Sequence, residues 1–384
     1  MTPRHLTVAL YDGLPDGGHR RWLAEPLATA LCDLGHDVVV FRPRGSGREP
    51  DDRPVRVDLP PARSGEPGRS FISQLPAARR SLRAALDAAA DLGADAFVDL
   101  EVDDRVWMHS MFGSADRFVA VLHSREQLSA TFGRDRLLRP AIHRARLRAF
   151  TKTLDKAEVV ICLRDPIAEA VETLCPGTRT VVIGYPVVSD ALTAAPPTDG
   201  SPGDGRLRIL VPGHIRPDKG LDELLAALVG FSTPTTVEVT GAQSPGLDLP
   251  VSVGPHAVVV DDRPVSEPEM GAAHHRADLV LAPLPAEFAG SGRARGTLLK
   301  AAAYGVPVVT TPAGLAQLPD GYGCVVVDPF TPAALRAALE GAVGRLDALA
   351  VAAAGRGPDH IRRHHTFEVF AAGLTEALDR GRAR

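Results

Sequence analysis

The sequence is poor in cysteine, in aromatic residues and in long apolar runs. Its 384 residues include four cysteines and 5% aromatic residues. No CxxC pair occurs among the cysteines, which are Cys32, Cys162, Cys175 and Cys324. This spacing predicts neither a disulfide framework nor a cysteine-bound metal, so we expect reduced thiols that serve as small core residues. The scarcity of aromatic residues argues against a surface on which nucleic-acid bases would stack.

An excess of charge of one sign is also missing. The chain has 43 Lys and Arg against 47 Asp and Glu, a net charge of -4, so it lacks the basic surplus typical of nucleic-acid binding. No apolar stretch approaches the roughly 18 residues of a membrane-spanning helix. The first apolar run, "LTVAL", is short and is followed by "YDGLPDGG", which is not the pattern of a signal peptide. We therefore expect a soluble cytoplasmic protein without a nucleic-acid partner.

What the sequence does contain is a regular alternation of strand-like and helix-like segments. Residues 6–10 and 36–41 are apolar strand patterns that flank a Gly-rich loop and a helical pattern over 22–35, which is a βαβ unit. The same rhythm resumes at residue 207, after a linker rich in Pro, Gly and Asp. Because 384 residues exceed what one core usually serves, we predict two parallel α/β domains. The predicted segments are a domain over 1–190, a linker over 191–206, a domain over 207–357 and a C-terminal helix over 358–384.

The segment "GHIRPDKGLDELLAAL", residues 213–228, places basic residues on a turn that leads directly into a helix. Free N–H groups and the dipole at a helix start favour an anion. Arg216 offers a planar fork of donors and Lys219 a compact charge, while Gly213 allows a tight turn. A solvent-exposed basic turn would explain this segment equally well when it is considered alone.

A second loop of similar chemistry lies between a strand and a helix over residues 283–314. Glycine exposes backbone N–H groups, and Ser, Thr and Arg add donors, which is what an anion cradle needs. Two such loops in one domain favour a phosphate site over a chance arrangement. The loop residues concerned are Glu287, Gly290, Ser291, Arg293, Arg295, Gly296 and Thr297.

These two segments resemble the C-terminal half of GT-B glycosyltransferases, close to the retaining GT4-type family. "DLVLAPLPAEFAG", "LLKAAAYGVPVVTTPAG" and "YGCVVVDPFTPAALRAAL" are similar to further segments of that family, and "GGHRRWLAEPLATALCDLGHDVVVF" is similar to its N-terminal segment. The likeness spans nearly the whole chain and is loose between Arg42 and Ala130. It implies an α/β GT-B fold: two Rossmann-like, doubly wound parallel-sheet domains facing a central cleft, with the C-terminal helix crossing back to the first domain.

The resemblance also implies roles for particular residues. His123 and Glu287 would be the catalytic residues beside the donor sugar, and Arg216 and Lys219 would hold the donor diphosphate. The family's second glutamate, which holds the ribose hydroxyls, aligns with Lys300. The other implied residues are Ser291, Gly296 and Thr297 at the diphosphate, Gly17, Gly18, Gly213 and Gly290 in loops at the sugar, and Arg293, Arg295 and Lys300 at the phosphates or nucleotide.

The activity that the resemblance implies is transfer of a sugar from a nucleoside-diphosphate sugar to an acceptor hydroxyl or amine, with retention. Neither a metal nor another cofactor is implied. The acceptor, a small molecule, a saccharide or a lipid-linked molecule, is not identified. Two alternatives stay open: a GT-B pseudo-glycosyltransferase or sugar-nucleotide epimerase, and a non-catalytic protein that binds a sugar nucleotide.

Three further features have plainer explanations. Asp99, Glu101 and Asp103 alternate along one face, and we interpret them as an exposed or capping cluster rather than a metal site. The pairs His274–His275 and His364–His365 are neighbours in sequence, which do not share a helix face, so we do not expect zinc there. A basic helical segment is interpreted as a solvated face, with contact to anionic lipid or a phosphorylated acceptor as the alternative. Its arginines are Arg136, Arg139, Arg144, Arg146 and Arg148.

Overall fold

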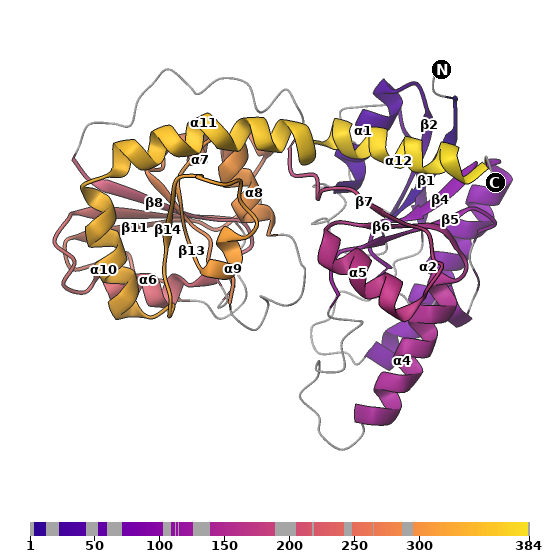
Figure 1. Cartoon of the computed structure of the whole chain (residues 1–384), viewed down its shortest axis with the longest axis horizontal. Coiled ribbons are helices and arrows are strands. Elements are labelled where there is room, and N and C mark those ends of the chain that lie inside the picture. The colour runs from indigo at the N-terminus through magenta and orange to yellow at the C-terminus, as the bar shows by residue number, and fades with distance from the viewer. Residues whose placement is uncertain are drawn as a thin grey trace. The chain divides into compact units, whose positions relative to one another are not determined.

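The computed structural model of the chain shows two compact units (Figure 1). Unit 1 comprises Met1–Val187 and Phe367–Arg384, and unit 2 comprises Val188–Gly290 and Arg295–Thr366. The chain enters unit 2 at Val188 and leaves it at Thr366, and an isolated parallel bridge joins these two residues. The structure describes residues 4–12, 23–43, 53–59, 71–102, 109–111, 113, 115–125, 139–188, 205–216, 219–241, 248–263, 265–285 and 295–382.

Unit 1 is built on a seven-stranded sheet in the order β3-β2-β1-β4-β5-β6-β7, and all of its strand pairs are parallel. Its strands are β1 (Thr7–Tyr11), β2 (Asp37–Pro43), β3 (Val55–Leu59), β4 (Ala96–Asp99), β5 (Phe118–Leu122), β6 (Ala157–Cys162) and β7 (Thr180–Val182). Its helices are α1 (Glu25–Asp33), α2 (Phe71–Asp91), α4 (Arg139–Leu154), α5 (Asp165–Leu174) and α12 (Phe367–Arg382). The central strands β4 and β5 are buried at every position, as expected of parallel strands whose two faces are covered by helices.

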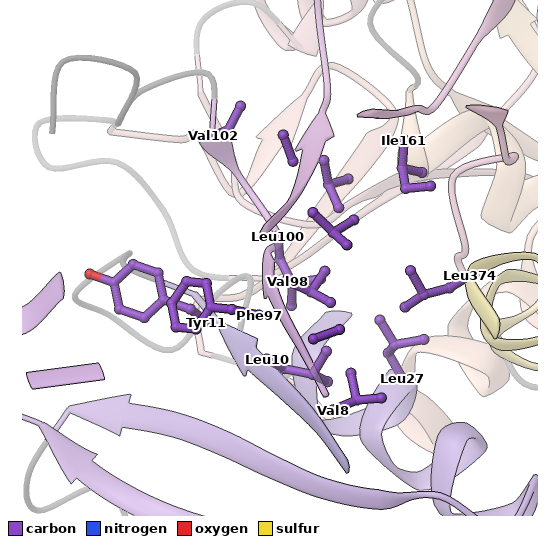
Figure 2. Close-up of a cluster of buried hydrophobic side chains, with 14 of the residues drawn as sticks. Val8, Leu10, Tyr11, Leu27, Phe97, Val98, Leu100, Val102, Ile161 and Leu374 are labelled. Carbon is purple, nitrogen blue, oxygen red and sulfur yellow. The ribbon is translucent and has the colours of Figure 1, made fainter. Parts of the chain in front are cut away.

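The last helix of the chain, α12, completes the core of unit 1. Figure 2 shows Leu27 of α1 and Leu374 of α12 pointing toward Val8 and Leu10 of β1, and all four side chains are fully buried. A buried hydrogen bond of 2.9 Å joins His36 Nε2 to Thr375 Oγ1 of the same helix. Unit 1 is therefore assembled from segments that are far apart in the sequence.

Unit 2 repeats the architecture with a second seven-stranded sheet, in the order β10-β11-β9-β8-β12-β13-β14. All pairs are parallel except the short β10–β11 hairpin. The strands are β8 (Leu207–Pro212), β9 (Thr235–Thr240), β10 (Ser252–Val253), β11 (His256–Asp261), β12 (Leu279–Leu281), β13 (Val308–Thr310) and β14 (Cys324–Val326). The helices are α6 (Leu221–Leu228), α7 (Glu267–Arg276), α8 (Gly296–Ala303), α9 (Pro312–Leu315), α10 (Pro332–Val343) and α11 (Leu346–His364). Two doubly wound parallel-sheet units confirm the predicted fold class.

The C-terminal helices differ from the pattern predicted from the sequence. We expected the C-terminal helix to begin at Pro358, but α11 begins at Leu346 and continues through Pro358 to His364. Proline inside a helix removes a hydrogen bond. Packing offsets this cost here, because α11 lies so close to α8 that a Cβ at Gly357 would be 2.3 Å from the Ala302 carbonyl oxygen.

Among the residues that the structure describes, no helix is both long enough and apolar enough to cross a membrane.

Candidate functional site

The strand order of unit 2 places a switch point between β8 and β12. From β8 the chain proceeds through α6 to β9 on one side, while β12 pairs with β8 on the other side. In open α/β sheets, ligands bind in the crevice that such a reversal leaves at the carboxyl ends of the strands. The residues that follow β8 and β12, and the helix start of α8, are therefore the candidate site of unit 2.

Two glycines bring the loops after β8 and β9 into backbone contact. Gly213 has a φ of +86° and its N–H donates to the Thr240 carbonyl oxygen at 2.9 Å. Gly241 has a φ of +133°, and a Cβ there would lie 2.3 Å from the carbonyl oxygen of Gly213. Both positions require backbone angles that L residues rarely adopt, and the second also lacks room for a side chain.

Lys219 lies at the centre of this region. Its side chain is buried, and its ammonium donates to the Pro212 carbonyl oxygen at 3.3 Å and to Thr297 Oγ1 at 3.1 Å. The first of these oxygens ends β8 and the second belongs to the first turn of α8. The next residue, Gly220, is the N-cap of α6 with a φ of +74°, where a Cβ would clash at 2.8 Å with Pro283 Cγ. The structure thus brings together Lys219 and Thr297, which are far apart in the sequence.

The N-terminus of α8 adds positive potential beside Lys219. The first turn of this helix has no acidic residue, so its free N–H groups and dipole face the site without a local carboxylate on the helix. Arg295 precedes the helix and is held at both ends, since its N–H donates to Gln317 Oε1 at 2.8 Å and its Nη2 donates to the Pro283 carbonyl oxygen at 2.9 Å. Arg216 is exposed, and its carbonyl oxygen accepts the Lys219 N–H at 3.0 Å.

Lys300 lies farther along α8 and is paired with a carboxylate. Its ammonium forms an ion pair with Glu267 at the start of α7. Burial, with Glu267 adding to the effect, raises the pKa of the neighbouring Tyr304. The Tyr304 ring lies 4.9 Å from the ring of His274, whose Nδ1 donates to the Met270 carbonyl oxygen at 2.7 Å, and burial lowers the pKa of His274 to about 4. A nucleotide contact of Lys300 stays a prediction.

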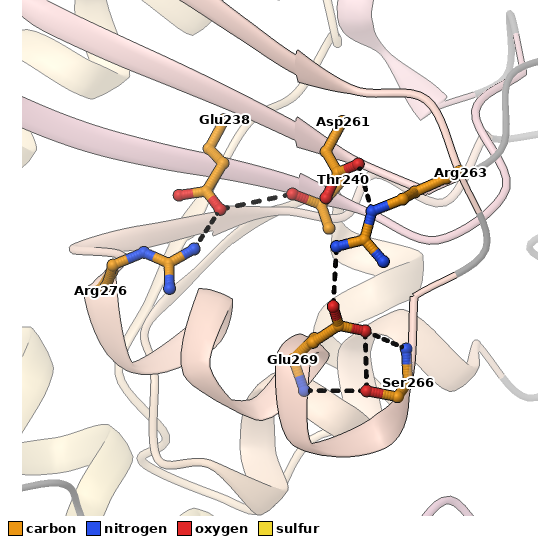
Figure 3. A network of polar contacts seen from close by, with 7 residues as sticks. All are labelled: Glu238, Thr240, Asp261, Arg263, Ser266, Glu269 and Arg276. Carbon is orange, nitrogen blue, oxygen red and sulfur yellow. Dashed lines mark hydrogen bonds and ion pairs between the residues drawn. The ribbon is translucent and has the colours of Figure 1, made fainter.

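The start of α7 is held by a separate polar network (Figure 3). Ser266 and Glu269 form a capping box, in which the Ser266 N–H donates to Glu269 Oε2 at 2.8 Å. Arg263 donates from Nη2 to Glu269 Oε1 at 2.7 Å and pairs with Asp261 at 3.0 Å. The hydrogen bond from Arg263 lowers the pKa of Glu269 to about 2. This network fixes the chain just after β11, at the same sheet edge as Lys219.

In unit 1 the corresponding edge carries His123, directly after β5. Its Nε2 donates to the Leu100 carbonyl oxygen at 2.6 Å, so Nε2 carries a proton, and in the neutral ring Nδ1 is the acceptor. The ring meets Tyr185 edge-on at 5.8 Å. Burial, followed by Glu101 and Asp12, raises the pKa of Tyr185 to about 12. A buried imidazole at a strand end therefore meets a phenol that is itself affected by two carboxyl groups.

Several of these unit 1 residues were not singled out from the sequence. Asp12 is buried directly after β1, where the strand order of unit 1 reverses. Its position directly after a predicted strand is the feature of the sequence that could have marked it as a candidate site residue. Asp99 was expected in an exposed or capping cluster. It does cap a turn, since its Oδ1 accepts the Glu101 N–H at 3.0 Å, but it is fully buried and its Oδ2 lies 2.7 Å from His109 Nε2.

No group of three or more His, Cys, Asp or Glu side chains is placed to hold a metal ion in the part of the chain that the structure describes. Arg144 and Arg148 of the basic helix α4 are exposed. The predicted residues that lie outside the described residues are Gly17, Gly18, Asp103, Arg136, Glu287, Gly290, Ser291 and Arg293, and the side chains of Arg139 and Arg146 lie outside them as well.

Sequence profiles of two known families match the chain over most of its length. The profile of Glycosyltransferase Family 4 matches residues 17–190, and that of Glycosyl transferases group 1 matches residues 206–344. The chain belongs to the GT4-like glycosyltransferases. A search of curated proteins finds no sequence match to this glycosyltransferase.

Solved structures of other proteins are similar to this glycosyltransferase over nearly its full length. Sucrose-phosphate synthase from Thermosynechococcus elongatus is 16% identical with a TM-score of 0.72, covering 99% of this chain and 100% of that one. HepE from Anabaena, in a complex with UDP and glucose, is 16% identical with a TM-score of 0.68, and the match covers 98% of this chain and 100% of that one. WaaG, a glycosyltransferase involved in lipopolysaccharide biosynthesis, is 17% identical with a TM-score of 0.65, and the match covers 97% of this chain and 99% of that one. At these identities the likeness shows a shared fold, which is GT-B.

Proposed function

We propose that this glycosyltransferase takes its sugar from a nucleoside-diphosphate sugar and that unit 2 binds this donor. The observation that carries the proposal is the buried ammonium of Lys219, held between the end of β8 and Thr297 in the first turn of α8. An ammonium beside a helix N-terminus at a switch point favours a ligand with several negative charges, and a diphosphate is such a ligand. The complex of the structural neighbour HepE with UDP and glucose supports the same donor class.

The chemistry follows from where charge develops. When the bond between the anomeric carbon and the diphosphate oxygen breaks, negative charge grows on the leaving diphosphate. Lys219, Arg216 and the N–H groups of Gly296 and Thr297 would stabilise that charge from fixed positions. Because these groups supply the positive potential, we propose a transfer without a metal or another cofactor.

We further propose front-face transfer with retention. The acceptor oxygen would attack the anomeric carbon on the side that the diphosphate leaves, and the acceptor proton would pass to a leaving phosphate oxygen. His123, with Nδ1 as an acceptor, would orient a sugar hydroxyl. Glu287 stays a predicted second contact to the donor sugar.

The four cysteines are free thiols, which supports the proposal of a reducing, cytoplasmic location. The acceptor is proposed only by class: a small molecule, a saccharide or a lipid-linked molecule.

The test is a transfer assay with UDP-, GDP-, ADP- and dTDP-sugars against a panel of acceptors, with and without EDTA. We expect release of the nucleoside diphosphate from one donor class, a product whose anomeric NMR signals show retention, and no loss of rate with EDTA. Conversion of the donor to its epimer, or donor binding without any turnover, would contradict transfer in favour of the alternative functions.

A further inference from the structure

We propose that Asp99 and His109 are positioning residues that fix the orientation and the protonated nitrogen of His123 through the Leu100 carbonyl group. The inference rests on the proposed function, because His123 is assigned there to the donor sugar. It gives a role to two side chains that neither the sequence patterns nor the comparisons assign, and all three residues belong to unit 1.

The turn that follows β4 connects Asp99 to His123. The Leu100 N–H donates to the Tyr11 carbonyl oxygen at 3.0 Å, which anchors this residue to β1. The carboxylate of Asp99 accepts the Glu101 N–H at 3.0 Å and so closes the turn around Leu100. The Leu100 carbonyl oxygen then accepts from His123 Nε2 at 2.6 Å. Where this carbonyl points therefore depends on the side chain of Asp99.

His109 in turn fixes the side chain of Asp99. His109 Nε2 lies 2.7 Å from Asp99 Oδ2, and both side chains are fully buried. The imidazole stacks on Phe118 of β5, with ring centroids 4.5 Å apart, and Lys156 Nζ donates to the His109 carbonyl oxygen at 3.2 Å. Phe118 begins β5, the strand whose end carries His123. The pair thus links the end of β4 to the strand that bears the candidate residue.

A purely stabilising role explains this pair poorly. Burying polar groups costs solvation energy, and apolar side chains of similar size often stabilise a core as well or better. Within the described residues, His109 Nδ1 is buried without a hydrogen-bond partner, which adds to that cost. Control of His123 gives the pair a function that apolar residues would lack.

The consequence concerns the two nitrogens of His123. As long as the Leu100 carbonyl oxygen accepts from Nε2, the proton stays there and Nδ1 presents a lone pair. If the turn loosens, the imidazole loses this acceptor and both tautomers become populated. A sugar hydroxyl that donates to Nδ1 would then be held only part of the time.

The primary measurement is the tautomer of His123 in the full chain, observed by NMR with ¹⁵N-labelled histidine and assigned by the signal lost in His123→Asn. We expect the Nε2–H tautomer in the wild type and in Asp99→Asn, which keeps an acceptor for the Glu101 N–H. Asp99→Leu should show mixed tautomers. The matched control is Asp95→Leu at the opposite end of β4, where Asp95 accepts the Thr7 N–H at 3.0 Å, and it should leave the His123 signal unchanged.

A second pair of variants covers the case in which Asp99→Leu does not fold. His109→Gln retains a donor toward Asp99, whereas His109→Phe keeps an aromatic ring against Phe118 and removes that donor. Mixed His123 tautomers in the Phe variant, with the wild-type tautomer in the Gln variant, support the proposal. An unchanged Nε2–H tautomer of His123 in folded Asp99→Leu or His109→Phe overturns it.

Kinetics separate this inference from the proposed function. If sugar transfer occurs, His109→Phe should lower kcat by roughly tenfold or more with little change in the donor KM, because misplaced groups slow the chemical step. A rise in donor KM with unchanged kcat would count against positioning. If no transfer is found but the tautomer changes as described, the positioning link stands and the proposed function fails.

Discussion

Replacing Gly241 with alanine should damage the proposed donor site of unit 2 without removing any charged group. The new Cβ would lie 2.3 Å from the carbonyl oxygen and 2.7 Å from the carbonyl carbon of Gly213. These are backbone atoms, which cannot turn away as the end of a flexible side chain can. The Gly213 N–H is also held by the Thr240 carbonyl oxygen at 2.9 Å, so the loop after β8 would have to shift.

The expected magnitude has two parts. An alanine at a φ of +133° costs about 1–3 kcal/mol in backbone strain. Forcing a methyl group into a packed contact adds about 1–3 kcal/mol. The matched control is Gly254→Ala, since Gly254 has a φ of +57° but nothing within 4 Å of an added Cβ, so it reports strain without contact.

The assay compares thermal unfolding and nucleoside-diphosphate binding of both variants with the wild type. We expect Gly241→Ala to be less stable than Gly254→Ala by about 1–3 kcal/mol, which for a domain of this size is roughly 2–12 °C in Tm. Gly241→Ala should also weaken nucleotide binding, because the displaced loop leads to Lys219, while Gly254→Ala should bind normally. Equal stability and equal affinity of the two variants would refute the close approach of Gly213 and Gly241.

Two further predictions concern stability in each unit. The buried imidazole of His274 has a pKa of about 4 against 6.5 for an ordinary histidine, so the unfolded chain takes up the proton first as the pH falls. Protonation of this group should therefore lower the free energy of unfolding by up to about 3 kcal/mol between pH 6.5 and 4. In urea titrations, His274→Phe should lack this pH-dependent loss of stability. An identical pH dependence of the wild type and His274→Phe would contradict the lowered pKa of His274. In unit 1, Leu374→Ala should cost about 2–5 kcal/mol in urea unfolding because its side chain is fully buried, whereas Arg380→Ala on the exposed face of α12 should cost far less. Equal effects of these two substitutions would argue against α12 as part of the core.

The strands were the most predictable part of the fold. Apolar runs such as Phe118–Leu122 and Ala157–Cys162 are strands in the structure because both faces of a parallel sheet are covered, which leaves a strong signal in sequence. The helix boundaries near the C-terminus were less predictable. Local preferences favour a helix start at Pro358, but the packing of Gly357 against Ala302 keeps α11 continuous, and that contact lies outside any local pattern.

The candidate site likewise has one part that could be predicted from the sequence and another that could not. The sequence pattern placed Lys219 and Thr297 each at the start of a helix, and the structure joins them by a hydrogen bond, while their role at a phosphate stays a prediction. The pairing of Lys300 with Glu267 could not be predicted, since it depends on how α7 packs beside α8. The link from His109 through Asp99 to His123 likewise depends on strand order, because β4 and β5 become neighbours only in the folded sheet.

The most direct test of the proposed donor site is the affinity of the full chain for nucleoside diphosphates, measured by calorimetry for the wild type, Lys219→Met and Lys152→Met. Lys152 is an exposed lysine of α4, so the same substitution there controls for loss of charge. We expect at least one nucleoside diphosphate to bind. Lys219→Met should weaken that binding by roughly tenfold or more, the effect of losing a charge-assisted hydrogen bond, and Lys152→Met should not. Absence of binding by every nucleoside diphosphate, or unchanged affinity in Lys219→Met, would contradict a diphosphate site at Lys219.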